Sequence, residues 1–157
     1  MEIERKYLVR ELPANLDGYP HVEIEQCYLC TWPTLRIRRM GDAYILTVKE
    51  NISPIVNREE EFALSREAWQ SLRTKCEGRP VQKTRYRIPL DGGLTAELDI
   101  FHGHHEGLQL VEVEFPDIES AGNFIPPLWF GPDVSTDPRY RNAYMALNEP
   151  HPAPLSF

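Results

Sequence analysis

Apolar and charged side chains alternate along this sequence in one segment after another, and this two-residue period constrains the fold more than any other feature. In Leu35-Arg36-Ile37-Arg38, for example, each apolar residue is followed by a cationic one. Successive side chains of a β-strand point to opposite faces, so each such segment makes a strand with one apolar and one charged face. The pattern predicts strands at residues 2–9, 22–31, 34–40, 43–50, 56–64, 81–88, 94–101 and 108–115.

Turn and helix signals separate the expected strands. Gly41-Asp42 and Asp91-Gly92-Gly93 are typical of tight turns. Ser65 is a candidate helix N-cap, and apolar residues recur at helical spacing after it. We expect helices at about 66–76, at 118–124 and from Asp137-Pro138 through Leu147, with irregular chain at 126–138 and 150–157.

The charged faces carry like charges close together, which destabilises a sheet unless something neutralises them. A single strand of this kind is ordinarily the wet face of a half-buried sheet. The whole set is better explained by a multivalent ligand, since divalent cations suit carboxylate pairs and phosphate oxygens suit arginine and lysine pairs. The residues that share the charged parity are Glu2, Glu4, Lys6, Arg36, Arg38, Lys49, Glu59, Glu61, Lys83, Arg85, Arg87, Glu97, Asp99, Glu112 and Glu114.

Eight mostly antiparallel strands with few helices favour a closed barrel or a sandwich, and closing a barrel leaves no unpaired edge strand. We expect the charged faces to line the interior of a barrel that holds a metal–polyphosphate complex, with the apolar outer faces covered by helices or partners. No repeat or linker divides the 157 residues. The sequence therefore predicts one domain over residues 1–157, of the α+β class and mainly β.

Net charge limits the classes of partner, and the first residues and the cysteines indicate the compartment. The formal charge is −7, which argues against a general nucleic-acid or anionic-membrane surface but leaves room for a small basic cavity. The first residues are charged and no apolar run is long enough to span a bilayer, so we expect a cytoplasmic protein. Cys27, Cys30 and Cys76 have no framework spacing and are expected to be thiols in a reducing cytosol.

The same charged residues give the chain a family resemblance. Glu2-Ile3-Glu4-Arg5-Lys6 resembles the Glu-x-Glu-x-Lys signature of the CYTH superfamily, the triphosphate tunnel metalloenzymes, and the later charged pairs follow it in order. Arg139-Tyr140-Arg141-Asn142 is similar to the basic helix that plugs the tunnel. The resemblance is closest to short bacterial inorganic triphosphatase-like members. It implies a closed eight-stranded antiparallel barrel with flanking helices and a C-terminal plug helix, and one or two Mg²⁺ or Mn²⁺ ions.

The implied activity is metal-dependent hydrolysis of a triphosphate, with inorganic tripolyphosphate as the expected substrate. Three alternatives remain open: a class IV-type adenylate cyclase that makes cyclic AMP from ATP, a thiamine triphosphatase, and a non-catalytic polyphosphate-binding module. A cyclase or thiamine triphosphatase needs a pocket for an organic group. Tyr28, Trp32 and Tyr44 are candidate walls for it, although packing explains such aromatics more often.

The resemblance and the charge chemistry together imply roles for individual residues. Glu2, Glu61 and Lys6 are the expected catalytic residues. Glu59, Glu97 and Asp99 are expected to orient the cations. The expected phosphate-binding residues are Lys6, Arg36, Arg38, Lys49, Lys83, Arg85, Arg139 and Arg141, and the expected metal ligands are Glu2, Glu4, Glu61, Glu112 and Glu114.

Four features lie outside the main pattern. Asn57 stands where the family often has arginine, and Arg58 is displaced by one residue. The plug segment carries arginine where lysine is common, and arginine is a poor proton donor. His102-Gly103-His104-His105 is expected to be an exposed turn rather than a metal site. The apolar stretch 124–130 is expected to cap the core or to form a homodimer contact.

Overall fold

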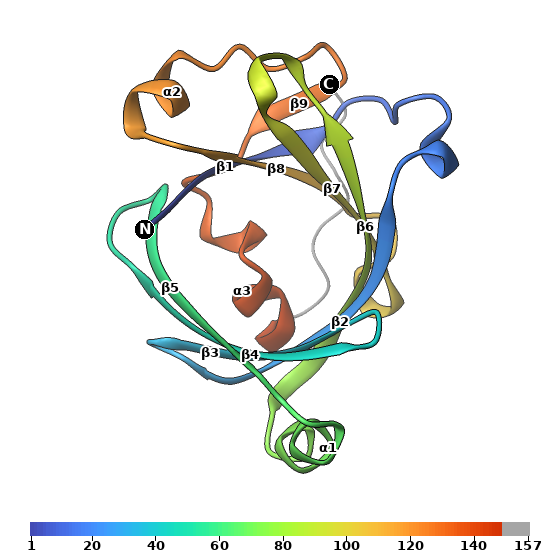
Figure 1. Ribbon diagram of the computed structural model, residues 1–157, viewed down its shortest axis with the longest axis vertical. Helices are drawn as coiled ribbons and strands as arrows, with labels where there is room; N and C mark the ends of the chain where they lie inside the picture. Colours follow the sequence, from blue (N-terminus) through green and yellow to red (C-terminus); the bar gives the residue numbers. More distant parts are fainter. Residues whose placement is uncertain (149–157) are drawn as a thin grey trace.

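The computed structural model describes residues 1–148 and is a closed antiparallel barrel (Figure 1). The sheet order is β5-β4-β3-β2-β6-β7-β8-β1, and β1 also pairs with β5, for example Glu2 with Asn57, which closes the ring. This confirms the expected eight-stranded barrel. The strands are β1 (Glu2–Val9), β2 (His21–Thr31), β3 (Thr34–Met40), β4 (Ala43–Asn51), β5 (Val56–Ala63), β6 (Glu77–Pro89), β7 (Thr95–His102) and β8 (Gln109–Phe115).

A ninth strand, β9 (Phe130–Asp133), lies in the stretch that was expected to be irregular. It pairs with the C-terminal half of β1, where Tyr7 lies opposite Asp133 and Val9 opposite Phe130. The prediction was wrong because the strand contains Gly131 and Pro132, which usually end strands. β1 pairs with β5 only at Glu2 and Ile3, so its edge is free beyond these residues. β9 forms because it pairs with that free edge.

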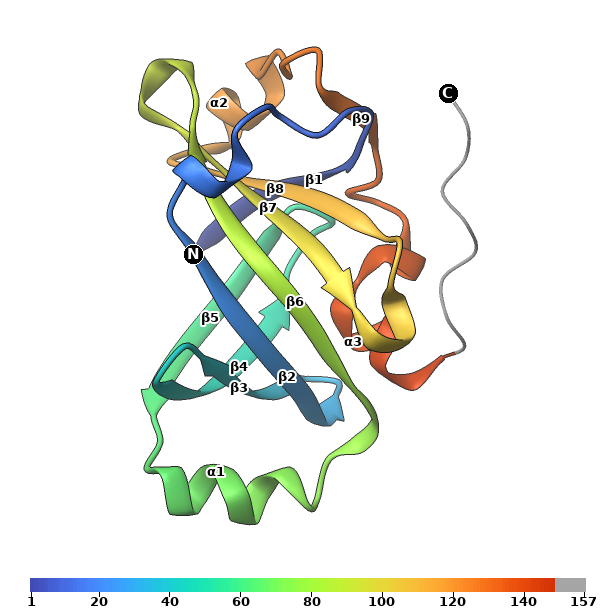
Figure 2. The same ribbon diagram turned by 90° about the vertical axis from the view of Figure 1, so that its right-hand side faces the viewer.

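Helix α1 (Arg66–Arg73) connects β5 to β6 and packs on the outside of the barrel (Figure 2). Ser65 caps it, as expected, by accepting a hydrogen bond from the Ala68 amide at 3.1 Å. The helix buries Trp69 against Cys27 and Ile37, on the outward face of β2 and β3. The helix ends three residues earlier than expected, and Arg73 forms an ion pair with Glu25 of β2 at 2.9 Å.

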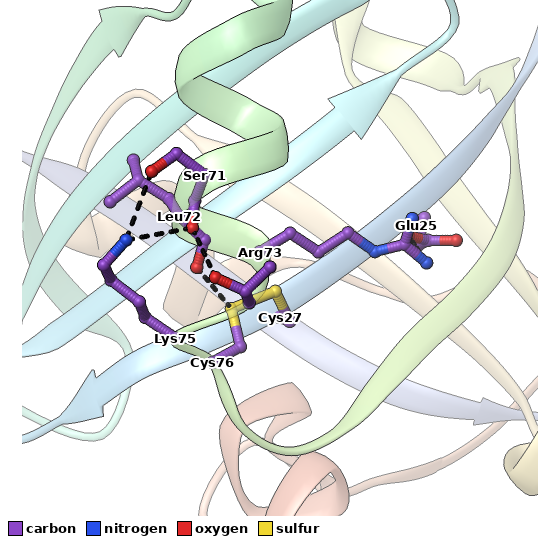
Figure 3. Close-up of a disulfide and its surroundings, with 8 residues drawn as sticks. Glu25, Cys27, Ser71, Leu72, Arg73, Lys75 and Cys76 are labelled. Atoms are coloured by element: carbon purple, nitrogen blue, oxygen red, sulfur yellow. Dashed lines mark hydrogen bonds and ion pairs between the residues drawn. A yellow bond between two sulfur atoms is a disulfide. The ribbon is translucent and has the colours of Figure 1, made fainter.

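Cys27 of β2 and Cys76, just after α1, form a disulfide (Figure 3), which corrects the expectation that all three cysteines are thiols. The two residues are 49 positions apart in the sequence, and their Cα atoms are 5.9 Å apart, within the range that a disulfide spans. Spacing along the chain could not reveal the pair, because the docking of α1 on the barrel brings it together. Cys30 is free, and its thiol faces the Trp32 carbonyl.

Helix α2 (Ile118–Asn123) and the stretch after it cover the outer face of β1 and β8. The rings of Phe124 and Phe130 pack against Tyr7, with centroids 6.1 and 5.1 Å away. This confirms that the stretch caps the core. Ile125 and Leu128 in the same stretch point into solvent, and the homodimer contact stays a prediction.

The C-terminal segment enters the ring of strands (Figure 1) as two short helical pieces rather than the single helix that we expected. A 3-10 turn (Pro138–Tyr140) is capped by Asp137, and α3 (Asn142–Leu147) follows. Arg141 between them has extended backbone angles, so the helical hydrogen bonds are interrupted there. Met145 and Ala146 of α3 pack on the inward-facing Leu8 and Leu110, so one end of the barrel interior is apolar.

His105 closes this apolar end and is 3% exposed, which corrects the expectation of a fully exposed histidine turn. Its Nε2 donates to the Met145 carbonyl at 2.9 Å, and its ring packs edge-on against Phe101. Other 3-10 turns lie at Leu16–Gly18, Asp91–Gly93 and Gly103–His105. Within residues 1–148, no helix has the length and apolar character needed to cross a bilayer.

Candidate active site

A cavity of about 1130 Å³ occupies the middle of the barrel and extends to its mouth. Alternating parity places the charged faces on its wall, as the sequence predicts. The predicted residues that line it are Glu2, Glu4, Lys6, Arg36, Arg38, Lys49, Glu59, Glu61, Lys83, Arg85, Glu97, Glu112, Glu114 and Arg141. Asp99 lies behind this wall, and Arg139 does not line the cavity.

Strands β3 and β6 form a cationic wall from Arg36, Arg38, Lys83 and Arg85, all buried. Neither Arg36 nor Arg38 forms an ion pair with any residue that the structure describes, and the Arg36 Nε is buried without a hydrogen-bond partner. Burial, and then the neighbouring charges of Arg36 and Arg85, lower the pKa of Arg38 to about 9. Such a wall disfavours its own positive charge until an anion binds.

Asp99 holds two members of the cationic wall from behind. Arg85 Nε and one terminal nitrogen reach its carboxylate at 2.8 and 2.9 Å, and Lys83 Nζ reaches it at 2.8 Å. Burial lowers the pKa of Lys83 to about 7 despite this partner. Because Asp99 is buried and binds both side chains, it fixes the orientation of Arg85 and Lys83 toward the cavity.

A carboxylate wall faces the cations, and Lys49 is placed among its members. Lys49 Nζ lies 3.1 Å from Glu2, 3.4 Å from Glu4 and 3.8 Å from Glu59. Burial opposes the charge of Lys49, but the attraction of Glu4 and Glu2 outweighs it and raises the pKa. Lys6 occupies a similar place beside Glu112 at 3.4 Å and donates to the Tyr140 carbonyl at 2.9 Å.

Crowding shifts the titration of the carboxylates themselves. Burial first, and then repulsion from Glu112, raise the pKa of Glu4 to about 7. Burial also raises the pKa of Glu2 and of Glu114, which pairs directly with Glu4 across β1 and β8. Glu112 behaves differently, because Lys6 and Arg85 overcome its burial and lower its pKa.

The donor set fits a hard divalent cation. Carboxylate oxygens are the ligands that Mg²⁺, Mn²⁺ and Ca²⁺ prefer, and burial raises the pKa values of Glu2 and Glu4 although Lys49 is near both. No three acidic, histidine or cysteine side chains within residues 1–148 already converge as a formed metal centre. The ammonium group of Lys49 lies near two of these carboxylates, 3.1 Å from Glu2 and 3.4 Å from Glu4.

The remaining predicted residues lie at the edge of the cavity or outside it. Glu61 lines it from an exposed position on β5, opposite Thr47 of β4. Glu97 contacts Arg85 at 3.3 Å and the half-exposed Arg87 at 3.1 Å. Arg139 is turned to solvent and pairs with Asp137 at 2.7 Å.

Within residues 1–148, no charged side chain takes the place of the arginine that the family often has at position 57. Asn57 is buried on the cavity wall and accepts a hydrogen bond from Asn51 at 3.0 Å. Arg58 does not replace the missing arginine, because it lies at the exposed rim of the cavity, 3.5 Å from the exposed Glu50.

The three candidate aromatic walls have different surroundings. Tyr28 is buried and lines the cavity, and Trp32 lies at its mouth with 77% of its surface exposed. Tyr44 faces the other way and packs on Trp69 outside the barrel, with ring centroids 5.7 Å apart.

Uncharged polar residues also contact the cationic wall, and charge patterning missed them. Gln26 is fully buried and contacts Arg38, and Asn142 contacts Lys83. Gln26 has the inward parity of β2, between the inward Ile24 and Tyr28, so parity could have found it. Asn142 could not be found in this way, because only the entry of α3 into the barrel brings it to the site.

Comparison with known proteins supports the resemblance. An inorganic triphosphatase of Nitrosomonas europaea is 44% identical over 154 residues, which span 95% of this chain and 99% of the relative. An inorganic triphosphatase of Acetivibrio thermocellus is 36% identical over 116 residues, 73% of this chain and 72% of the relative. A crystal structure of an inorganic triphosphatase superposes with a TM-score of 0.72 at 40% identity, and the match covers 96% of this chain and 97% of that chain.

No protein-family model matches the chain. The barrel, the two charged walls and a relative that matches nearly end to end nevertheless agree. The chain belongs to the inorganic triphosphatase family, within the CYTH superfamily of triphosphate tunnel proteins.

Proposed function

We propose that the protein hydrolyses inorganic tripolyphosphate in the barrel cavity with the help of a divalent metal ion. The observation that carries this proposal is the pairing of two walls in one enclosed space. Arg36 and Arg38 present positive charge and have no ion-pair partner within residues 1–148, and Glu2, Glu4 and Glu59 share the ammonium group of Lys49. A metal–triphosphate complex supplies negative charge to the first wall and positive charge to the second. The names of the relatives favour the inorganic substrate over the alternatives.

The cationic residues would bind and align the phosphate chain. Arg36 and Arg38 of β3 lie across the cavity from the carboxylates, with Lys83 and Arg85 beside them on β6. Arginine can grip phosphate oxygens through two parallel hydrogen bonds, and lysine acts as a point charge. Lys6 and Lys49 would lie between the walls, with Arg141 from the plug segment at the mouth. Arg139 would need to leave Asp137 before it could contribute.

The carboxylates would hold the metal and direct water. Glu2, Glu4, Glu61, Glu112 and Glu114 are the proposed ligands, and Mg²⁺ or Mn²⁺ are the proposed ions. A bound ion would neutralise charge on the phosphate oxygens as the anhydride bond breaks. Glu2 and Glu61 would orient the attacking water, and Lys6 would stabilise the reacting phosphate. Asp99 and Glu97 would keep Arg85 in place.

The test is phosphate release from tripolyphosphate with Mg²⁺ or Mn²⁺, compared with the same sample in EDTA. We expect rapid release with metal, none in EDTA, and slower turnover of ATP and of thiamine triphosphate. If the protein forms cyclic AMP from ATP faster than it releases phosphate from tripolyphosphate, the cyclase alternative is favoured. Tight binding of tripolyphosphate without release under any of these metals would favour a binding module and contradict hydrolysis.

A further inference from the structure

Two amide side chains connect the cationic wall across four elements of the barrel. Arg38 Nε of β3 donates to Gln26 Oε1 of β2 at 3.0 Å. Gln26 Nε2 donates to Asn142 Oδ1 of α3 at 3.0 Å, and Lys83 Nζ of β6 donates to the same oxygen at 3.1 Å. The plug helix therefore touches the phosphate-binding side chains through one amide oxygen.

The cations at the two ends determine how both amides are turned. Arginine and lysine can only donate hydrogen bonds, so each must meet an amide oxygen. Gln26 therefore turns its oxygen to Arg38 and its nitrogen to Asn142, and Asn142 turns its oxygen to both Gln26 and Lys83. The arrangement is fully oriented, because reversing either amide would bring two donors together.

Three other cavity cations are held by carboxylates. Lys6 lies beside Glu112, Lys49 lies among three glutamates, and Arg85 is forked on Asp99. Arg38 meets only an amide oxygen among its hydrogen-bond acceptors in residues 1–148. Lys83 meets the Asn142 amide and shares the Asp99 carboxylate with Arg85. An amide fixes the position of a cation without cancelling its charge.

We propose that Gln26 and Asn142 are positioning residues that hold Arg38 and Lys83 in place and, because they are uncharged, add no negative charge that would compete with a polyphosphate anion for these cations. This inference rests on the proposed function to the extent that the cavity binds a triphosphate. It adds that the affinity for the anion depends on the neutrality of two residues that are not themselves expected to bind metal. It also makes the docking of α3 a condition for ordering the cationic wall.

The sharpest variant is Asn142→Asp, which preserves the shape of the side chain and both accepted hydrogen bonds. It adds a negative charge beside Lys83, so the free protein should be as stable as wild type or more stable. The anion should bind less tightly, because it must then compete with the new carboxylate. We expect tripolyphosphate affinity to fall by about tenfold or more, measured by calorimetry in EDTA, while the melting temperature is unchanged or raised.

Two further variants separate charge from shape. Asn142→Leu keeps the size but removes the acceptor, and should lower both the melting temperature and the affinity. Asn15→Asp makes the same amide-to-acid change at an exposed loop residue, and should alter neither. Phosphate analysis of each calorimetry sample shows whether the anion stayed intact.

The outcomes are separable from those of the proposed function. Asn142→Asp protein that binds tripolyphosphate within twofold of wild type would show that neutrality is irrelevant. Wild-type affinity in Asn142→Leu would show that the residue positions nothing. If wild-type protein binds tripolyphosphate but releases no phosphate with metal, the hydrolytic function fails while the binding comparison still decides this inference.

Discussion

The interior of the barrel has a charged middle and an apolar end, and the same strands build both. On β1 the inward residues change from Glu4 and Lys6 to Leu8, and on β8 they change from Glu112 to Leu110. Adjacent inward residues are only about 7 Å apart along a strand. Along one face of a strand, the charged middle and the apolar end are thus only one inward-facing position apart. Burial of charge is unfavourable in the first region, and burial of apolar side chains stabilises the fold in the second.

The two regions show how a tunnel for a polyanion can be stable when empty. Burial raises the pKa of Glu4 to about 7 and lowers that of Arg38 to about 9, so the charged forms of these two groups disfavour the folded state without ligand. The apolar end compensates by burying Leu8, Phe101, Leu110 and Met145 against α3. We therefore expect mutations in the two regions to affect different measurements.

The largest effect should come from Leu110→Ala at the apolar end. Removing buried methyl groups beneath α3 should lower the free energy of unfolding by about 2–5 kcal/mol. Because the cavity wall is untouched, KM for tripolyphosphate should stay within about threefold of wild type wherever the protein remains folded. Urea denaturation and steady-state kinetics test the two halves, and a large rise in KM at unchanged stability would contradict the division into regions.

The disulfide should have the next largest effect, and it too should act on stability alone. Cys76→Ser opens a loop with a sequence separation of 49 residues. A constraint of that length contributes about 2–4 kcal/mol, mainly by restricting the unfolded chain. The control is Cys30→Ser, which changes a free thiol on the same strand. Equal melting temperatures for oxidised wild type and Cys76→Ser would contradict this expectation.

Glu4→Gln should have the opposite profile. It should reduce kcat by on the order of 10², with partial recovery at high Mn²⁺ if metal occupancy is lost. The raised pKa means that the wild-type carboxylate favours folding below about pH 4.5 and loses that contribution as pH rises through about 7. Metal-free Glu4→Gln protein should thus unfold at a higher temperature than wild type at pH 8. Normal turnover at limiting metal would show that Glu4 is not a ligand.

Arg38→Ala should have the smallest of these effects. It removes one charged phosphate contact, so KM for tripolyphosphate should rise by about tenfold, with a modest fall in kcat. Stability should change little, because the repulsion from Arg36 and Arg85 disappears together with the hydrogen bond to Gln26. An unchanged KM in folded protein would remove Arg38 from the phosphate-binding set.

Strand parity predicted most of the fold and the charged lining, because a period of two directly determines which side chains face inward. The prediction located the ends of most strands within about two residues, yet it missed β9 and the four extra residues at the start of β6. It also treated the whole inward face as polar. Leu8, Val81 and Leu110 share the inward parity and flank the charged lining: Leu8 follows Lys6, Val81 precedes Lys83, and Leu110 precedes Glu112. Reading each strand to its end would have revealed the apolar region.

The remaining differences come from contacts between distant segments. The Cys27–Cys76 bond depends on where α1 docks, and the burial of His105 depends on where α3 ends. Asn142 reaches Lys83 only because the C-terminal segment enters the barrel. None of these contacts has a local pattern. The specific metal ligands, the cytoplasmic location and a homodimer remain predictions.

The closure of the barrel has a mechanical consequence. β1 and β8 are joined by six residue pairs, from Ile3 with Phe115 to Leu8 with Leu110, whereas β1 and β5 share only Glu2 with Asn57 and Ile3 with Val56. The barrel is therefore held together most weakly at this seam, the contact between β1 and β5. Hydrogen exchange of the backbone amides should be fastest there. Glu2 itself sits in the seam. If β1 and β5 separate slightly, the distances between the carboxylates on these two strands change, whereas the distance between the two arginines of β3 does not. The width of the tunnel can therefore vary on the carboxylate side and not on the arginine side.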